Sequence, residues 1–294
     1  MIDIQYLQQW IGRTEEKEDL AAPSPVRGLA ATLDRHDPQP RHNDPMPPLA
    51  HWLFFLADAP QSEIDRDGHA KRGAFLPPVP LPRRMFAGAR IQFHAPLRIG
   101  DSIRQVSEIA NVSHKEGRSG VLVFVLIRHR IYGADGLKVT EEQDIVYRDE
   151  APATAQAKVA TASPVEAHRA SEKAIQASWS RTIQPDPVML FRFSALTFNG
   201  HRIHYDRAYA MDVEGYPGLV VHGPLTAMLL MDLCRRHRPD ATIEHFSFRA
   251  MRPIFDTAPF HIAGTPSPDL RSARLWGQNP DGTIAMEAEV RFAA

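Results

Sequence analysis

The chain has little of what several broad protein classes require. Its 294 residues include one cysteine, Cys234, so an intrachain disulfide is excluded and a reducing compartment is expected. Its 34 basic residues are balanced by 35 acidic ones, which leaves no field to attract nucleic acid or an anionic membrane. No apolar run approaches the roughly 20 residues of a membrane span, and no secretory leader is recognisable. We therefore expect a cytoplasmic protein without nucleic-acid or membrane partners.

Signatures of metal, phosphate and thiol chemistry are also scarce. His201 and His204 lie three positions apart, but no paired cysteines or HExxH helix accompany them, so no metal site is predicted. No glycine-rich phosphate loop occurs, since residues 117–120 have the composition of a hairpin turn. Cys234 falls within an apolar helical pattern, which favours a packed core thiol over a nucleophile.

Alternating apolar residues predict strands in two groups. The first group comprises residues 88–94, 102–113, 119–132 and 137–147. The second comprises residues 179–183, 243–251, 258–266, 272–279 and 283–292. Within each group an Asp-Gly pair predicts a hairpin, at Asp135-Gly136 and at Asp281-Gly282.

Helices are predicted before the strands of each group. Residues 1–12, a short stretch near residues 29–33 and residues 51–57 have helical patterns, and the prolines of residues 77–82 require an extended loop. A longer apolar helix is predicted to begin at Pro224. Residues 149–180 are alanine-rich and weakly patterned, which is typical of a linker. We predict an N-terminal half over residues 1–148, a linker over 149–176 and a C-terminal half over 177–294.

The densest group of reactive side chains lies in residues 192–206. Four of them fall within eight positions, which is too polar for a core strand: Asn199, His201, His204 and Asp206. Soon afterwards the chain reads Val-Val-His-Gly-Pro over residues 220–224. A helix that begins there presents unpaired N–H groups and a partial positive charge, which suit an oxygen that becomes negative during a reaction. Together the two segments predict acid–base chemistry beside a carbonyl group.

Residues 197–206, Thr-Phe-Asn-Gly-His-Arg-Ile-His-Tyr-Asp, resemble the hydratase signature of the (R)-specific enoyl-CoA hydratase and MaoC-like dehydratase family. That signature usually reads Thr-Gly-Asp-x-Asn-Pro-x-His-x-Asp. Residues 218–223 are similar to the family's Gly-x-x-x-His-Gly step into the central helix of the hotdog fold. This version of the motif resembles those of the two-hotdog hydroxyacyl-thioester dehydratases and of the itaconyl-CoA and mesaconyl-C4-CoA hydratases. The resemblance is strong over residues 191–255 and weaker over 80–150.

The resemblance implies an α+β double hotdog, with two antiparallel sheets each wrapped around a central helix. It implies a hydro-lyase that adds water to an enoyl-CoA, with itaconyl-CoA or mesaconyl-C4-CoA as substrate and citramalyl-CoA as product. A broader (R)-3-hydroxyacyl-thioester dehydratase and a non-catalytic acyl-CoA-binding hotdog subunit are the alternatives. No cofactor is expected, because the thioester itself withdraws electrons. Edge strands that need covering favour a homodimer or a higher oligomer.

The matched positions carry the expected roles. His204 would shuttle the proton, because imidazole titrates near neutral pH, and the Gly223 N–H would bind the thioester oxygen. Asn199 replaces the usual aspartate. Because an amide does not take up a proton at pH 7, Asn199 would orient a water molecule, or its Asn-Gly pair would simply form a turn. Asp206 is expected to cap the following helix.

A substrate with a free carboxylate requires a cation, and arginine suits it best. Four arginines are candidates, the first three by position after the proline-rich loop and the last by its place in the motif: Arg83, Arg84, Arg90 and Arg202. Arg202 is equally suited to face solvent. His222, at the predicted start of the helix, completes the expected substrate-binding residues.

Overall fold

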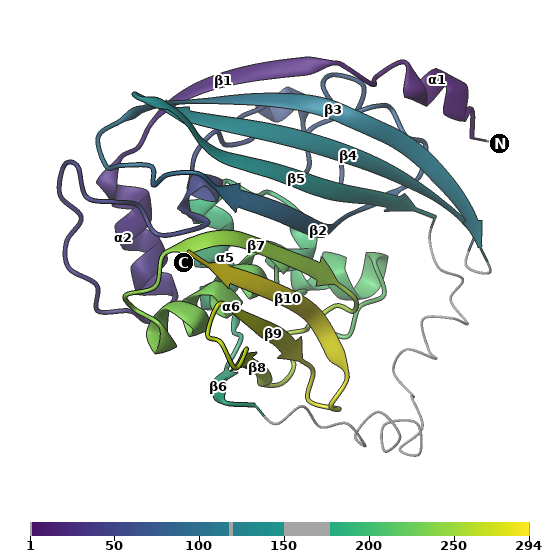
Figure 1. Ribbon diagram of the computed structural model, residues 1–294. Coiled ribbons are helices and arrows are strands. Elements are labelled where there is room, and N and C mark those ends of the chain that lie inside the picture. The colour runs from purple at the N-terminus through teal and green to yellow at the C-terminus, as the bar shows by residue number, and fades with distance from the viewer. Residues whose placement is uncertain (1, 118–119, 150–176, 294) are drawn as a thin grey trace. The chain divides into compact units, whose positions relative to one another are not determined.

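The structure is a computed structural model (Figure 1) that describes residues 2–117, 120–149 and 177–293. Its chain divides into two compact units. Unit 1 comprises Met1–Glu150 and Arg192–His201, and unit 2 comprises Ala151–Phe191 and Arg202–Ala294. Each unit is described by itself. Of the predicted linker, residues 149–176, only Asp149 lies within the described residues. The predicted domain limits stay predictions. No sequence signal indicated that Arg192–His201 groups with unit 1.

Unit 1 contains an antiparallel sheet in the order β1-β3-β4-β5-β2. Its strands are β1 (Thr14–Leu20), β2 (Arg83–Phe93), β3 (Ser102–Gly117), β4 (Gly120–Gly133) and β5 (Gly136–Arg148). The four strands predicted for the first half are confirmed, although β2 begins earlier, and β1 was not predicted. Gly136 has a φ of 117° in the β4–β5 turn, the left-handed conformation that makes glycine suitable for this predicted hairpin.

The helices of unit 1 are short. They are α1 (Ile4–Gln8), α2 (Pro23–Thr32), and the 3-10 turns η1 (Ala50–Leu53) and η2 (Gln61–Glu63). The prediction of a helix over residues 51–57 was wrong in extent, because Leu49 and Phe55 on either side of η1 have φ angles of 69° and 56° that a helix does not allow. Leu7 of α1 and Val79 and Leu81 of the proline-rich loop pack with the apolar side chains of β3, β4 and β5.

A row of polar side chains crosses three strands of unit 1. Ser107, His129 and Glu141 are cross-strand partners on β3, β4 and β5. The Glu141 carboxylate is 1% exposed and lies 2.8 Å from His51 Nε2, and it accepts a hydrogen bond of 3.0 Å from Trp52 Nε1. Burial alone would raise the pKa of Glu141, but the bond and the charge of His51 hold it below its usual value. The row therefore ties η1 to the sheet through a buried carboxylate.

Unit 2 contains an antiparallel sheet in the order β7-β10-β9-β8-β6. Its strands are β6 (Trp179–Ile183), β7 (Ile243–Ala250), β8 (Phe260–Pro266), β9 (Ser272–Gln278) and β10 (Ile284–Phe292). The helix α6 (Gly223–His237) contacts β6, β8, β9 and β10, and its residues 225–234 are all buried. A sheet around one apolar helix is the predicted hotdog arrangement. Within the described part of unit 1, no helix has the length of α6.

Two further predictions for unit 2 are confirmed. The Cys234 side chain in α6 is fully buried, and burial raises the pKa of its thiol to about 12. The Gly282 φ of 82° lies in the turn between β9 and β10, where the second hairpin was expected. None of the helices in the described residues combines the length and the apolar character needed to span a membrane. The remaining helical segments are α5 (Pro187–Leu196), the 3-10 turn η4 (Arg202–His204) and the π-helical turn η5 (Tyr209–Val213).

Candidate active site

The orientation of the His204 imidazole is fixed by the backbone of unit 2. His204 ends η4, is 7% exposed, and its Nδ1 lies 2.7 Å from the Val220 carbonyl oxygen. Because a carbonyl oxygen only accepts hydrogen bonds, Nδ1 carries the proton of the neutral ring and Nε2 is the basic atom. The ring stacks on His222 with centroids 3.7 Å apart. His204 is therefore held in one tautomer, as a proton-transfer group requires.

The segment that holds His204 is bonded on both sides. The Val220 N–H donates to the Ile203 carbonyl oxygen at 3.0 Å, and the Val221 N–H donates to the Ile254 carbonyl oxygen at 2.8 Å. Ile203 and Val220 also pack together with Tyr209 in a buried apolar cluster. These contacts position the histidine side chain just before the start of α6.

The start of α6 has the predicted geometry. His222 is the N-cap residue in an extended conformation, and Pro224 occupies the first turn. The His222 carbonyl oxygen accepts from the Thr226 N–H at 3.0 Å, and its ring is fully buried. Gly223 is the first residue of the helix. Its N–H is thus among those without a partner within the helix, and the role of this group as an oxyanion hole stays a prediction.

A buried carboxylate orders the approach to α6. Asp256 accepts hydrogen bonds from the Leu219 N–H at 2.9 Å and from the Arg207 guanidinium. Its own N–H donates to the Leu219 carbonyl oxygen at 3.0 Å. A Cβ atom at Gly218 would lie 2.6 Å from Asp256 Oδ1 and 2.8 Å from Thr257 Cγ2. Glycine at position 218 is therefore needed for close approach.

We expect Gly218→Ala to destabilise the protein by about 1–3 kcal/mol, because the new methyl group must displace Asp256 or Thr257. Urea unfolding measures the loss. The control is Gly133→Ala, where the nearest atom to the methyl group would be Lys138 Cε, which lies further away, at 3.1 Å, and belongs to a flexible side chain. A Gly218→Ala protein as stable as the Gly133→Ala protein would contradict the close-approach explanation.

The first part of the hydratase motif lies in unit 1 and forms a turn. The Asn199 N–H donates to the Ser194 carbonyl oxygen at 2.8 Å, and the Asn199 Oδ1 atom accepts from the His201 N–H at 3.0 Å. Phe198, just before it, has a φ of 47°. Asn199 thus closes a turn with its own side chain, but the positive φ lies at Phe198 and not in the Asn199-Gly200 pair, where the prediction placed it. The turn is compatible with the water-orienting role, because the side-chain NH2 group has no hydrogen-bond partner among the described residues.

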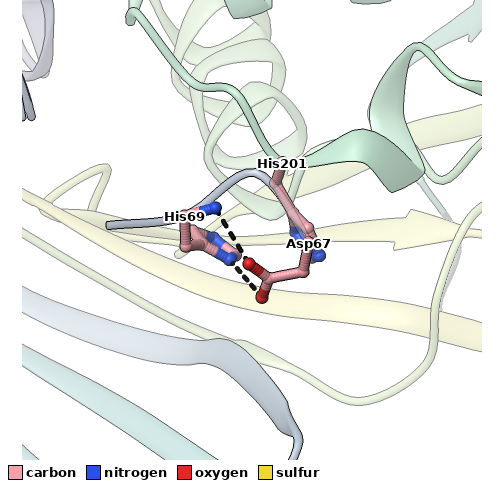
Figure 2. A group of neighbouring side chains, drawn as sticks. All are labelled: Asp67, His69 and His201. Atoms are coloured by element: carbon pink, nitrogen blue, oxygen red, sulfur yellow. Dashed lines mark hydrogen bonds and ion pairs between the residues drawn. The ribbon is translucent and has the colours of Figure 1, made fainter. Parts of the chain in front are cut away.

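Sequence reasoning missed a group of side chains next to this turn. Asp67, His69 and His201 face one another in unit 1 (Figure 2). Asp67 accepts from the His69 N–H at 2.9 Å, its Oδ2 atom lies 2.9 Å from His69 Nδ1, and the two imidazole centroids are 4.1 Å apart. A Cβ atom at Gly200 would lie 2.8 Å from the Gly68 carbonyl oxygen. The loop around Gly68 thus packs directly on the motif, a contact that no local sequence pattern predicts.

This group offers ligand atoms for a metal, all within 4.8 Å of one another. The Asp67–His69 hydrogen bond, however, uses a proton on Nδ1. Burial lowers the pKa of His69, and the charges of Arg84 and Arg72 lower it further. Burial would raise the pKa of Asp67, but its bond with His69 holds it well below the usual range. Two guanidinium groups nearby oppose a divalent cation, so the surroundings favour an anion.

The candidate arginines lie in different surroundings. Arg84 on β2 is the cross-strand partner of Tyr147, whereas Arg83 is the partner of Arg148 on the other face. Arg90, also on β2, forms ion pairs with Glu142 at 3.2 Å and Asp144 at 2.6 Å.

In unit 2, Arg202 forms an ion pair with Asp206 at 2.7 Å and stacks on the Tyr209 ring. Asp206 Oδ1 also accepts from the Tyr209 N–H at 3.0 Å, which confirms the predicted helix cap. The structure therefore brings His204, His222 and Gly223 together within unit 2, and places Asn199 and Arg84 in unit 1.

Comparison with known proteins supports the predicted fold and the predicted class of enzyme. The chain is 51% identical, over 96% of both chains, to the mesaconyl-C(4)-CoA hydratase of Chloroflexus aurantiacus. Among solved structures, a MaoC-like dehydratase from Phytophthora capsici covers 99% of this chain and 99% of its own, at a TM-score of 0.67 and 11% identity. A Mycobacterium tuberculosis protein described as a double hotdog has a TM-score of 0.52 at 10% identity, with 96% of each chain covered.

These likenesses confirm the predicted double hotdog fold. The family model for hydroxyacyl-thioester dehydratase type 2 matches residues 49–256, a range that includes both halves of the hydratase motif, η1 and the start of α6. Together with the relative at 51% identity, this match confirms the predicted hydro-lyase class. The chain belongs to the hydroxyacyl-thioester dehydratase type 2 family of MaoC-like hotdog enzymes.

Proposed function

We propose that this enzyme hydrates a short dicarboxylic enoyl-CoA, with mesaconyl-C4-CoA as the preferred substrate and citramalyl-CoA as the product. The observation that most directly supports this proposal is the fixed tautomer of His204, whose Nδ1 is bound to the Val220 carbonyl oxygen just before the start of α6. The choice of substrate is supported by the 51% identity to the Chloroflexus hydratase. Itaconyl-CoA, an isomeric dicarboxylic substrate, belongs to the same proposal.

The proposed mechanism assigns one step to each group. The Gly223 N–H binds the thioester oxygen as negative charge develops on it. For mesaconyl-C4-CoA, His204 Nε2 takes a proton from water while the water oxygen forms its bond to Cβ and the π bond between Cα and Cβ breaks, and the same imidazole returns a proton to Cα. From its place in the motif alone, five residues before His204, the Asn199 NH2 group is assigned the role of orienting the water. One water molecule is consumed, His204 ends as it began, and no metal or redox cofactor takes part in the proposal.

We expect kcat/KM for mesaconyl-C4-CoA to exceed that for crotonyl-CoA by about tenfold or more, the scale of one charge-assisted contact to the second carboxylate. Loss of the enoyl-thioester absorbance measures both rates. Equal or faster use of crotonyl-CoA would favour the second candidate, a broader (R)-3-hydroxyacyl-thioester dehydratase, which the description of the matching family model supports. Hydration of neither substrate, by protein that binds acyl-CoA, would favour a non-catalytic subunit.

We further propose that the enzyme works in the cytoplasm as a homodimer or a higher oligomer. The single cysteine suits a reducing compartment. Within the described residues, β1 pairs only with β3 and β6 only with β8, so both are edge strands whose backbone groups a second copy would cover. Light scattering should give at least twice the chain mass of 33.0 kDa. A mass of one chain at every working concentration would contradict the proposal.

A further inference from the structure

We propose that Arg84, Arg72 and Tyr147 bind the free carboxylate of the acyl group. This inference rests on the proposed function, because it assigns the specificity for a dicarboxylic substrate to a particular site in unit 1. Tyr147 and Arg72 lie outside the hydratase motif, and neither has a signature in the sequence.

The first observation is an unsatisfied hydroxyl group. Tyr147 on β5 is fully buried, and its hydroxyl has no hydrogen-bond partner of ordinary geometry among the described residues. Burial raises the pKa of this phenol, and the charges of Arg84 and Arg72, together with the Arg84 guanidinium close to the phenol oxygen, oppose that rise. Arg84 can only donate, so the phenol O–H is still without an acceptor. The phenol therefore stays protonated at neutral pH as a donor. A buried donor without an acceptor costs about 1–3 kcal/mol, and a bound carboxylate oxygen would remove that cost.

The second observation is that Arg84 and Arg72 carry positive charge that no carboxylate among the described residues neutralises through an ion pair. Arg84 is the cross-strand partner of Tyr147, so both side chains lie on the same face of the sheet. Among the described residues, neither Arg84 nor Arg72 forms an ion pair with a carboxylate. Asp67, the carboxylate next to His69, is already bound to that histidine. The two half-buried guanidinium groups therefore keep a positive charge that suits a single anion.

The third observation is that Arg72 is held in place. Its Nη1 donates to the carbonyl oxygens of Val79 and Leu81, its Nη2 donates to that of Pro82 at 2.7 Å, and its Cζ lies 5.3 Å from the centroid of the Tyr147 ring. These bonds use three of the five guanidinium N–H groups. The remaining two, on Nε and Nη2, are available in a fixed position, which reduces the entropy lost when a carboxylate binds.

Position also favours a substrate group over a structural ion. The charges of both arginines lower the pKa of His69, whose ring lies against that of His201 in the hydratase motif. The anion would therefore lie within unit 1, close to the first part of the motif. A carboxylate and a CoA phosphate share the chemistry that this site recognises. They are distinguished by a substrate that has the phosphates but lacks the second carboxylate, and crotonyl-CoA is such a substrate.

The test compares mesaconyl-C4-CoA with crotonyl-CoA as substrates for Tyr147→Phe and Arg84→Gln. We expect each variant to raise KM for mesaconyl-C4-CoA by about tenfold or more, with KM for crotonyl-CoA unchanged. The matched controls are Tyr132→Phe and Arg104→Gln. Arg104 and Tyr132 are cross-strand partners, as Arg84 and Tyr147 are, and the Arg104 guanidinium lies over the Tyr132 ring. Unlike Arg84, Arg104 forms an ion pair with Glu16, at 3.2 Å. Neither control should change KM for either substrate.

Each remaining outcome decides the matter. A parallel rise in KM for both substrates would overturn the proposal in favour of a CoA-phosphate site, and unchanged values for a folded variant would overturn it altogether. Tyr147→Phe removes a single oxygen atom, so it tests the site even if Arg84→Gln does not fold. If the wild-type enzyme hydrates neither acyl-CoA, the proposed function has failed. If it hydrates both without preference, the proposed substrate preference has failed as well. If it prefers mesaconyl-C4-CoA and the folded variants keep that preference, only the carboxylate site has failed.

Discussion

Replacement of His204 by alanine is expected to lower kcat about hundredfold or more, the usual scale of a lost general acid–base group. The reason is specific to this ring, because the Val220 carbonyl oxygen fixes the proton on Nδ1 and leaves Nε2 to exchange protons with the substrate. Asn199 cannot take over this role, because an amide does not take up a proton at pH 7. Within residues 197–206, His201 is the one other imidazole. Steady-state hydration kinetics with a saturating enoyl-CoA measure the change.

Two further variants make this result interpretable. His204→Gln keeps a side chain of similar length against the buried His222 ring, so it should be folded and should be as slow as His204→Ala. His237→Ala is the matched control, because His237 is also a histidine of unit 2 that stacks on an aromatic ring, that of Trp179. It should keep wild-type turnover. Near-wild-type kcat for a folded His204→Gln protein would remove His204 from the mechanism.

Loss of the Glu141 carboxylate is expected to cost about 3–5 kcal/mol in the free energy of unfolding, as for other broken buried ion pairs. Glu141→Ala would remove the buried carboxylate that now binds the His51 imidazole and the Trp52 indole N–H. Denaturant unfolding, followed by tryptophan fluorescence, measures the change. Glu142→Gln is the control, because the neighbouring carboxylate is 30% exposed and forms only surface ion pairs worth up to about 1 kcal/mol.

The same carboxylate predicts how stability depends on pH. The pKa of Glu141 is lowered in the folded protein, so its contribution is present above the unfolded pKa of about 4.3. It is lost as the pH falls through the still lower folded value, because the unfolded state then binds the proton more readily. Glu141→Gln should weaken this acid dependence. An identical slope of stability against pH below pH 5 in wild type and variant would contradict the assignment.

The strands and α6 were predictable because their signals are local. Alternation, Asp-Gly turns and a proline at the start of a helix each act within a few residues. The predicted strands and Asp-Gly turns were confirmed in both units, and the proline at the start of α6 was confirmed in unit 2. The prediction for residues 51–57 failed because their conformation is set by a distant residue. Glu141 binds His51 and Trp52 across about 90 positions of sequence, and no periodicity in an apolar run records such a bond.

The candidate site divides in the same way. His204, His222 and Gly223 were found because they lie within one recognisable segment, and their roles stay predictions. His222, predicted to bind substrate, is fully buried and stacks on His204. The Asp67–His69 pair was missed, because only folding brings it to His201. Arg84 differs from Arg83 and Arg90 through the register of β2 with β5, which assigns each side chain to a face. A list of arginines by position lacks that information.

Because Cys234 is buried, the rate at which its thiol reacts with a labelling reagent reports the opening of α6. The only thiol of the chain is fully buried in this helix, and its pKa of about 12 keeps it protonated at neutral pH. A thiol reagent therefore reacts only with molecules in which α6 has moved away from the sheet. The rate of labelling, compared with that of an unfolded peptide, gives the free energy of that opening without any denaturant. A ligand that binds at the start of α6 should lower the rate at which Cys234 is labelled.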